Sequence, residues 1–363
     1  ENQNMTMLAV VLVVGLLIGG GVGWFMKPAE TTGGGDVEVI TETVYEHPFK
    51  NKEVQIGYIS SSASGLETME PFLETIIEPD LNEYTAKLGY GTSFTFVIDQ
   101  ADSQAAIHLE KVQSFKSMGL EIFIGGPWSS MAMASLSYVN ENDMLMISTS
   151  STSPLLAIEG DRLDRICPTD FVQAPALAEM LYTYGIEQVI VFQRADAWGD
   201  GIYNLWHEEW IDRGFGELER VRYAAESTEY ANYLSTMNDV IANAAAEYGY
   251  ERIGVLTESF DESVVYVTQT ADYPETRKVM WFGCESTGRT QRMLDDASGL
   301  QVQLGLFSSF MAPGKSWKWV SLEDRYYDIA QTNAGFYTGC DYDGTWCTAL
   351  TMLSVASDKA TPV

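Results

Sequence analysis

Basic residues are scarce in this chain of 363 residues. Lysine and arginine together number 21 against 51 aspartates and glutamates, so the formal net charge at pH 7 is −30. Binding to a phosphate backbone needs a basic surface, and this shortage therefore argues against a nucleic-acid partner. It also argues against docking of the folded part on an anionic membrane. The acidic excess is explained more simply as a device for solubility or as an adaptation to a salty exterior.

The residues that most often carry enzyme or metal chemistry are equally few. His47, His108 and His207 are the only histidines, and none stands in a catalytic pattern. The segment 207–210 begins like a zinc-protease motif, but Ile211 stands where that motif needs its second histidine. The sequence contains no GxSxG nucleophile elbow and no GxxxxGK[ST] phosphate loop. We therefore predict no enzyme activity, no metal and no cofactor.

Cysteine is also rare. Cys167, Cys284, Cys340 and Cys347 form no CxxC pair, and no histidine is close enough to suggest a zinc site. An even number in an exported chain permits disulfides, but spacing alone does not give the pairing. For Cys340 and Cys347, which lie close together in the sequence, a local bridge and two buried free thiols both stay open.

One long apolar run lies near the N-terminus. Met5–Met26 carries no charge and is long enough to span about 30 Å of hydrocarbon as a helix. The alternative is a cleaved signal peptide, but the run is longer than a typical signal core and no basic segment precedes it. We predict a hydrophobic or transmembrane helix within residues 1–27, and a flexible linker over residues 28–52 that contains the glycine-rich tether 29–36.

Three glycines recur at every fourth position of this helix, at Gly15, Gly19 and Gly23. Such GxxxG steps let helix backbones approach closely and favour self-association in lipid or in a helical bundle. The alternative, that glycine is simply frequent in membrane helices, is equally open.

The rest of the chain alternates between strands and helices. A first series has predicted strands at 54–60, 93–98, 122–124 and 144–147, with helices at 67–88 and 103–118. After a break at 164–170, a second series has strands at 188–192, 218–223, 252–256, 278–282 and 301–306, with helices at 172–184, 202–212, 229–247 and 263–270. Alternation of this kind predicts parallel sheets with right-handed crossovers. Two such series indicate two α/β lobes, and the cleft between lobes is the default place for a small ligand.

Two turns in the stretch 121–155 combine glycines and hydroxyls at the ends of short apolar runs. The first strand ends in the glycine turn 125–127, and the second runs into the hydroxyl-rich loop 148–153. At the carboxyl edge of a parallel sheet, helix N–H groups and hydroxyls of this kind bind anions such as a carboxylate. Either turn alone is explained as well by helix capping, but their pairing in one βαβ unit favours an anion site.

Other residues that follow predicted strands complete a candidate ligand site. The first lobe supplies Ser129, Ser130, Ser150, Ser151 and Thr152, and the second supplies Asp196, Trp198, Phe260 and Glu285. Hydroxyls suit a carboxylate, whereas a lone acid beside aromatic rings suits an ammonium group with an apolar side chain. Structural alternatives exist, because Glu285 could be a helix N-terminal charge, Trp198 a packing aromatic and Asp196 a loop cap.

The order of motifs resembles the type I periplasmic binding proteins, specifically the leucine/isoleucine/valine-binding branch of ABC-transporter solute receptors. The resemblance runs from Val54 to Met352 and rests on the sequence and spacing of all the motifs together. They are VQIGYISS, VIDQADSQAA, FIGGPWSS, MISTSSTSPLL, RICPTDFVQAPALA, DAWGDGI, WFGCESTG and CDYDGTW.

The resemblance implies an α/β fold of two Rossmann-like lobes with parallel sheets, which close on an amino acid or similar solute and deliver it to a membrane permease. Lobe 1 is expected from residues 53–164 plus 308–363, and lobe 2 from residues 165–307. By the same resemblance, the hydroxyls of Ser129 and Thr152 hold the ligand carboxylate and Ser150 contributes a backbone group.

On the second lobe the resemblance implies that Trp198 and Phe260 are aromatic residues at the ligand and that Glu285 pairs with the ligand ammonium. Two departures from the family stand out. No cysteine near the N-terminus is available for a lipid anchor, and family members usually continue beyond the position that matches Val363. We therefore expect either a longer native chain or an unusual C-terminal end.

Our first functional hypothesis is a membrane-tethered, extracellular solute-binding protein of an ABC transporter, on the surface of an archaeal cell. It would capture a branched-chain type of amino acid, or a related amide, without chemical turnover. The second hypothesis is a structural subunit of a cell-surface filament or layer that reuses this fold, because an uncharged N-terminal helix with glycine steps is also typical of pilin-like proteins.

Overall fold

A computed structural model describes residues 46–288 and 291–360 of this chain. The predicted helix Met5–Met26, with Gly15, Gly19 and Gly23, and most of the predicted linker lie outside these residues. Within the described ranges, no helix is both long and apolar enough to cross a membrane.

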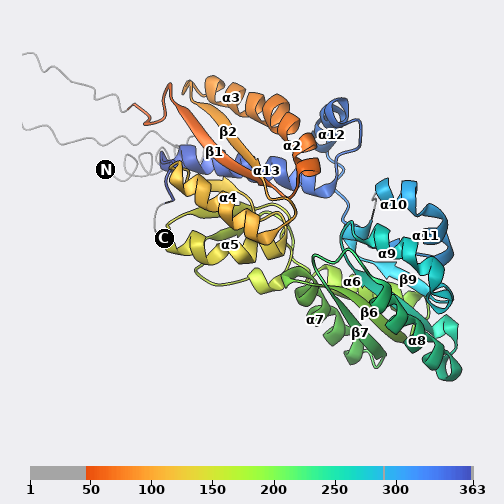
Figure 1. The fold of residues 1–363 in the computed structure, drawn as a ribbon. Coiled ribbons are helices and arrows are strands. Elements are labelled where there is room, and N and C mark those ends of the chain that lie inside the picture. Colours follow the sequence, from red (N-terminus) through yellow and green to blue (C-terminus); the bar gives the residue numbers. More distant parts are fainter. Residues whose placement is uncertain (1–45, 289–290, 361–363) are drawn as a thin grey trace, which may run out of the picture.

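Lobe 1 is built on a parallel sheet with the strand order β2-β1-β3-β4-β5 (Figure 1). The strands are β1 (Glu53–Ser60), β2 (Ser93–Gln100), β3 (Ile122–Ile124), β4 (Leu145–Ser148) and β5 (Leu163–Arg165). Its helices are α2 (Ala63–Phe72), α3 (Glu78–Lys87), α4 (Ala105–Ser117), α5 (Ser129–Glu141), α12 (Trp317–Ala330) and α13 (Phe336–Val355). The short turn η1 (Leu73–Ile77) joins α2 to α3, and η2 (Pro154–Leu156) follows β4.

Lobe 2 repeats this plan with the strand order β10-β9-β8-β6-β7, again all parallel. The strands are β6 (Gln188–Ala195), β7 (Gly216–Ala224), β8 (Ile253–Glu258), β9 (Met280–Gly283) and β10 (Phe307–Ser308). Its helices are α6 (Gln173–Thr183), α7 (Ala197–Asp212), α8 (Ala231–Tyr248), α9 (Ser263–Gln269), α10 (Gln291–Asp296) and α11 (Ser298–Leu304). Short helical turns are η3 (Tyr250–Arg252), η4 (Thr270–Asp272), η5 (Pro274–Arg277) and η6 (Glu285–Thr287).

The sheet of lobe 2 is buried on both faces, which explains why its strands are continuous apolar runs. Along β6, Ile190 and Phe192 pack with the residues of α8 and α9, whereas Val189 and Val191 pack with those of α6 and α7. This alternation follows from the two-residue period of a strand. Lobe 1 has the same arrangement of two clusters, one on each face of its sheet.

The predicted strand at 301–306 is wrong. Residues up to Leu304 form α11, Gly305 ends the helix in the left-handed conformation at φ 58°, and β10 follows at 307–308. The apolar residues at positions 302, 304 and 306 imitate the period of a strand, but Val302 is 79% exposed, as the outer face of a helix allows. The sequence also gave no sign of β5, because this edge strand of three residues buries only Leu163.

The folded part begins a few residues before the predicted start near Lys52. Phe49 is buried against lobe 1, and His47 Nε2 is 2.8 Å from the carbonyl oxygen of Leu353 near the end of α13. The four cysteines are free thiols, so the local bridge between Cys340 and Cys347 is not formed.

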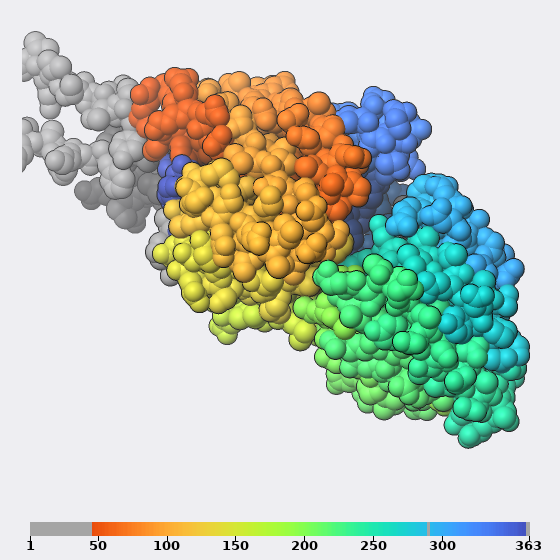
Figure 2. All heavy atoms as spheres, viewed as in Figure 1, coloured from red at the N-terminus to blue at the C-terminus, as the bar shows by residue number. Residues whose placement is uncertain are grey.

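In the described residues the chain passes from lobe 1 to lobe 2 after β5 and returns after β10 to form α12 and α13. Figure 2 shows the lobes as two masses that meet along a limited boundary. At this boundary the Ser153 hydroxyl donates to the carbonyl of Ala197, at 2.7 Å. The helix α7 approaches closely here, because a Cβ added at Gly201 would lie 2.9 Å from Cδ of Pro154.

Candidate ligand-binding site

The carboxyl ends of both sheets lead into loops that carry the predicted site residues. In lobe 1 these are the glycine turn after β3 and the hydroxyl loop, residues 148–153, after β4. In lobe 2 they are the loops after β6, β8 and β9. Since ligands of open α/β sheets bind outside the carboxyl ends of the strands, this is where the site is expected.

The two turns of lobe 1 are hydrogen-bonded to each other. The Ser150 hydroxyl donates to the carbonyl of Pro127 at 2.7 Å, and the Ser148 and Ser151 hydroxyls both donate to the carbonyl of Gly126. Ser129, buried in the first turn of α5, accepts from the Ser153 amide at 3.2 Å. The serines predicted to bind the ligand therefore hold the shape of the loops from which they would do so.

His108 holds the glycine turn through a hydrogen bond with the Gly126 amide. It was not predicted as a site residue. Its Nε2 accepts from the Gly126 amide at 2.8 Å, so Nδ1 carries the proton that bonds Ser135 Oγ at 2.7 Å. Burial lowers the pKa of His108 to about 3, which keeps the ring neutral. The sequence pattern predicted that His108 lies in a helix, which is α4, but it did not reveal the hydrogen-bond partners of the ring.

Thr152 faces the first crossover between the lobes. It is 2% exposed and donates to Asp170 Oδ2 at 3.0 Å, while Gln173 Nε2 donates to Asp170 Oδ1 at 3.1 Å. Burial raises the pKa of Asp170, and these two hydrogen bonds partly oppose that shift. The structure thus joins a predicted residue of lobe 1 to an acid at the start of lobe 2.

Glu285 lies directly beyond β9 and is 6% exposed. Its amide donates to Gln173 Oε1 at 2.9 Å, and Tyr337 of α13 reaches Oε1 at 3.5 Å. The other carboxylate oxygen, Oε2, has no hydrogen-bond partner among the described residues. Burial, reinforced by the charge of Asp170, raises the pKa of Glu285 to about 8. A cation placed beside it would reverse that shift.

The predicted aromatic residues stack on each other. The rings of Trp198 and Phe260 are stacked with centres 4.6 Å apart, and the ring of Trp128 of lobe 1 is stacked with Phe260 at 4.8 Å. We call these three rings the aromatic stack. Trp128 occurs in one of the motifs but was not predicted as a site residue, because only the fold brings it opposite lobe 2.

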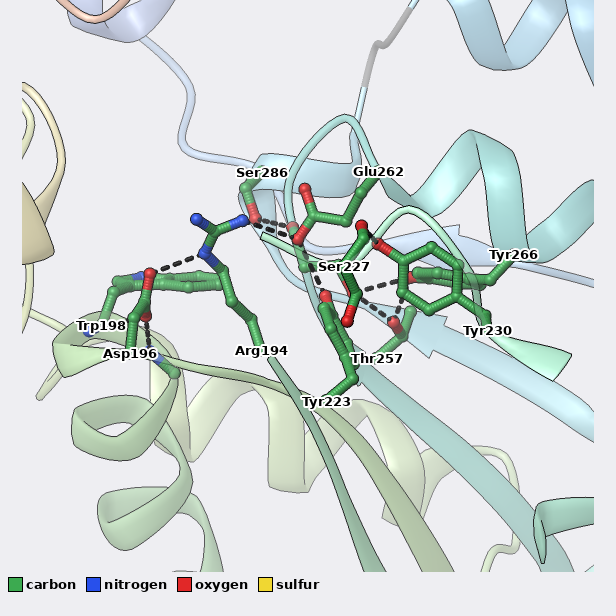
Figure 3. A network of polar contacts seen from close by, with 12 residues as sticks. Arg194, Asp196, Trp198, Tyr223, Ser227, Tyr230, Thr257, Glu262, Tyr266 and Ser286 are labelled. Carbon is green, nitrogen blue, oxygen red and sulfur yellow. Dashed lines mark hydrogen bonds and ion pairs between the residues drawn. The ribbon is translucent and has the colours of Figure 1, made fainter. Parts of the chain in front are cut away.

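Arg194 covers the aromatic stack. Its guanidinium carbon lies 4.8 Å from the ring centre of Phe260 and 5.4 Å from that of Trp128. The same group forms ion pairs with Asp196 at 2.6 Å and Glu262 at 2.9 Å (Figure 3). Rings that already accept a guanidinium are suited to cationic groups in general.

Asp196 is a helix cap, which agrees with the structural alternative considered for it. Its carboxylate accepts from the amides of Trp198 at 3.1 Å and Gly199 at 3.0 Å, which caps the N-terminus of α7. This cap fixes Trp198 in its buried position. For Ser130, by contrast, the described residues show no side-chain hydrogen bond to another predicted site residue.

Comparison with known protein families shows the family of this chain. Residues 80–301 match the family described as the receptor family ligand binding region. The chain belongs to this family. Its fold is that of the type I periplasmic binding proteins, so the family-level resemblance seen in the sequence is confirmed.

Solved structures of similar fold support this. The leucine binding protein LivK of Thermotoga maritima is 16% identical with a TM-score of 0.65, and 85% of each chain is covered. A substrate-binding protein of Desulfitobacterium hafniense in complex with Leu is 18% identical with a TM-score of 0.63, again over 85% of each chain. A solute binding protein of R. palustris in complex with 4-hydroxybenzoate is 14% identical with a TM-score of 0.69, over 85% of this chain and 83% of the other.

A curated relative is the uncharacterized protein MJ1266 of Methanocaldococcus jannaschii, which is 25% identical over 269 residues. The match spans 72% of this chain but only 63% of that protein, which is less than two thirds of its length.

Proposed function

We propose that this protein is the extracellular solute-binding component of an ABC transporter. It captures an amino acid of the branched-chain type, or a related amide, and releases it unchanged to a permease. The family and the fold support a ligand-binding role, and the chemistry of the cleft supports a ligand with a carboxylate at one end and an ammonium group at the other.

The observation that carries this proposal is the state of Glu285. A buried carboxylate without a full set of partners is costly unless a counter-charge arrives. Oε2 of Glu285 has no partner among the described residues, and the acid contacts Tyr337 of the opposite lobe. An ammonium group bound here would pair the charge and lie between the two lobes.

The hydroxyl side of the site completes the ligand model. In this proposal Ser129 and Thr152 hold the ligand carboxylate, and Ser150 contributes a backbone group. Trp198 and Phe260 contact the ligand side chain. The support is that all five residues lie in the loop or the first helical turn that follows a strand, and that hydrogen bonds hold the hydroxyl loop in shape.

Closure of the two lobes is the proposed mechanism. The lobes, residues 53–164 plus 308–363 and residues 165–307, would rotate about hinges at 165–170 and 306–313. Support comes from the crossovers, which are the connections between two separately packed cores.

The predicted N-terminal helix completes the proposal outside the described residues. Met5–Met26 would anchor the protein at the cell surface, and Gly15, Gly19 and Gly23 would permit self-association. If that helix instead builds a filament, electron microscopy of the full chain would show polymers that disappear when Gly19 is replaced by Leu, because a bulky residue separates the backbones.

Calorimetric titration of the full chain with amino acids and matched acids lacking the amine tests the proposed function. We expect saturable heat with at least one amino acid and at least tenfold weaker binding of its amine-free analogue, since the latter leaves Glu285 unpaired. Absence of binding across the whole amino-acid panel would refute the proposed ligand class.

A further inference from the structure

Glu258 is a buried acid at the site that neither the family resemblance nor the proposed function uses. It is the last residue of β8 and is 0% exposed. Neither of its carboxylate oxygens has a hydrogen-bond partner among the described residues. Burying an acid without hydrogen-bond partners costs free energy of folding, so a binding partner for Glu258 is a reasonable explanation for its presence.

The strand register places Glu258 at the same edge of the sheet as Glu285. Thr257 pairs with Gly283 on the neighbouring strand β9, so Glu258 lies level with Cys284, one residue before Glu285. Neighbouring strands are about 4.8 Å apart, which puts the two acids on adjacent strand ends. Phe260 follows Glu258 by two residues, in the loop that begins where β8 ends.

The direction of the side chain follows from the alternation along β8. Leu256 packs in the cluster formed with α6 and α7, and Glu258, two residues later, lies on the same face of the sheet. Cys284 belongs to that cluster as well. The N-termini of α6 and α7 lie on this face, and α6 begins at Gln173, which bonds both Asp170 and the amide of Glu285.

The electrostatic surroundings of Glu258 agree with this placement. Burial raises the pKa of Glu258 well above its ordinary value, and the charge of Asp170 adds to the shift. Arg220 opposes it, but its guanidinium is bonded to Gln193 at 2.7 Å and Asp200 at 2.8 Å. No described cation is therefore hydrogen-bonded to Glu258.

The charges at this strand edge exceed what a branched-chain amino acid needs. Its single ammonium group would pair with Glu285, and its aliphatic side chain would leave both oxygens of Glu258 without a partner. The guanidinium of Arg194 lies over the aromatic stack, but its charge is already paired with Asp196 and Glu262, which limits its repulsion of a second cation.

We propose that the ligand carries a second cationic group and that Glu258 binds it, which makes the ligand a basic amino acid of the lysine, ornithine or arginine class. The proposal rests on the proposed function, because it assumes that Glu285 binds the α-ammonium group. It replaces the branched-chain side chain by one that ends in an amine or guanidinium.

Titration of the full chain with L-lysine, L-ornithine, L-arginine, L-leucine and L-norleucine tests this. Norleucine has the same unbranched carbon chain as lysine but lacks the terminal amine. We expect at least one basic amino acid to bind more than tenfold tighter than leucine and norleucine. In Glu258→Gln, that preference should fall by at least tenfold while the affinity for norleucine changes less than threefold.

The controls separate the two levels of the proposal. Asp341→Asn alters a buried acid of lobe 1, bonded to Tyr58 and Thr149, and should leave the preference intact. Circular dichroism melts verify that both variants are folded, and Glu258→Met, which also removes the carboxylate, replaces Glu258→Gln if the latter does not fold. Tight binding of leucine with no preference for basic amino acids would overturn this inference alone. Failure of every amino acid to bind would overturn the proposed function itself.

Discussion

In lobe 1 the polar groups at the carboxyl edge of the sheet hydrogen-bond to one another, whereas in lobe 2 two acids at the same edge keep oxygens without a partner. Ser150 and Ser151 are engaged with the carbonyls of the glycine turn. Glu258 and Glu285 are buried and incompletely paired. Lobe 1 thus has a hydrogen-bonded, neutral surface at this edge, and in the proposed function the ligand supplies the counter-charge for lobe 2.

The largest expected effect concerns the lobe 2 side of this comparison. Glu285→Gln keeps the shape of the side chain but removes its charge, so the affinity for an amino acid should fall about 100-fold, as expected for a buried charge pair worth about 3 kcal/mol. Calorimetric titration measures it. Glu275→Gln is the matched control, because Glu275 is an acid of the same lobe that pairs with Lys278 instead of facing the cleft. Equal losses in both variants would remove the special role of Glu285.

The next effect concerns the preformed side. His108→Leu leaves the Gly126 amide and the Ser135 hydroxyl without their partner, which should lower the free energy of unfolding by about 2 kcal/mol. Chemical denaturation measures it, with His207→Leu as control, because the His207 side chain is 40% exposed. A loss as large in the control would contradict the role assigned to His108.

The same residue has a pH signature with a defined sign. The folded-state pKa of His108 is about 3, below the unfolded value of 6.5. Its contribution to stability is therefore complete above pH 6.5 and is lost as pH falls toward 3. The gap in stability between the wild type and His108→Gln should narrow over that window. Comparing the two proteins cancels the opposite contribution of Asp170 and Asp341, whose pKa values burial raises.

A pH dependence of binding should belong to lobe 2 alone. Because the pKa of Glu285 is raised to about 8, the acid is largely protonated at neutral pH without ligand. An ammonium ligand favours the charged form, so affinity should rise by up to about tenfold per pH unit between pH 6 and 8. Titration in buffers of different ionisation enthalpy would show about one proton released per ligand at pH 7. A flat profile would indicate that Glu285 is already charged.

The fold could be predicted from the sequence because strand and helix periods repeat along most of it. The exception at 301–306 shows the limit, since a helix of seven residues with apolar positions two apart imitates a strand. For Asp196 the sequence offered a loop cap only as an alternative, because the helix was predicted to begin at 202, whereas α7 begins at Ala197.

The site was less accessible to the sequence than the fold. Their positions after strand ends drew attention to the hydroxyl of Thr152 and the acid Glu285. They did not reveal Asp170, which accepts a hydrogen bond from Thr152 and raises the pKa of Glu285. Trp128 and His108 gave no local signal, because their contacts depend on partners that only the tertiary structure supplies, and the burial of Glu258 also depends on the tertiary structure. From sequence alone, a tryptophan is interpreted as a core residue, a histidine on the apolar side of a helix as a packing residue, and a glutamate at a strand end as a surface residue.

The close approach at Gly201 has a mechanical consequence. Ser153 and Pro154 of lobe 1 touch α7 here with no room for a methyl group, and Arg165 in the adjacent crossover bonds the carbonyl oxygens of Ser151 and Ser153. Surfaces in such tight contact do not slide past each other without first separating. In the proposed closure, the two lobes would therefore pivot at this contact beside the crossover, and the residues farthest from it would move most.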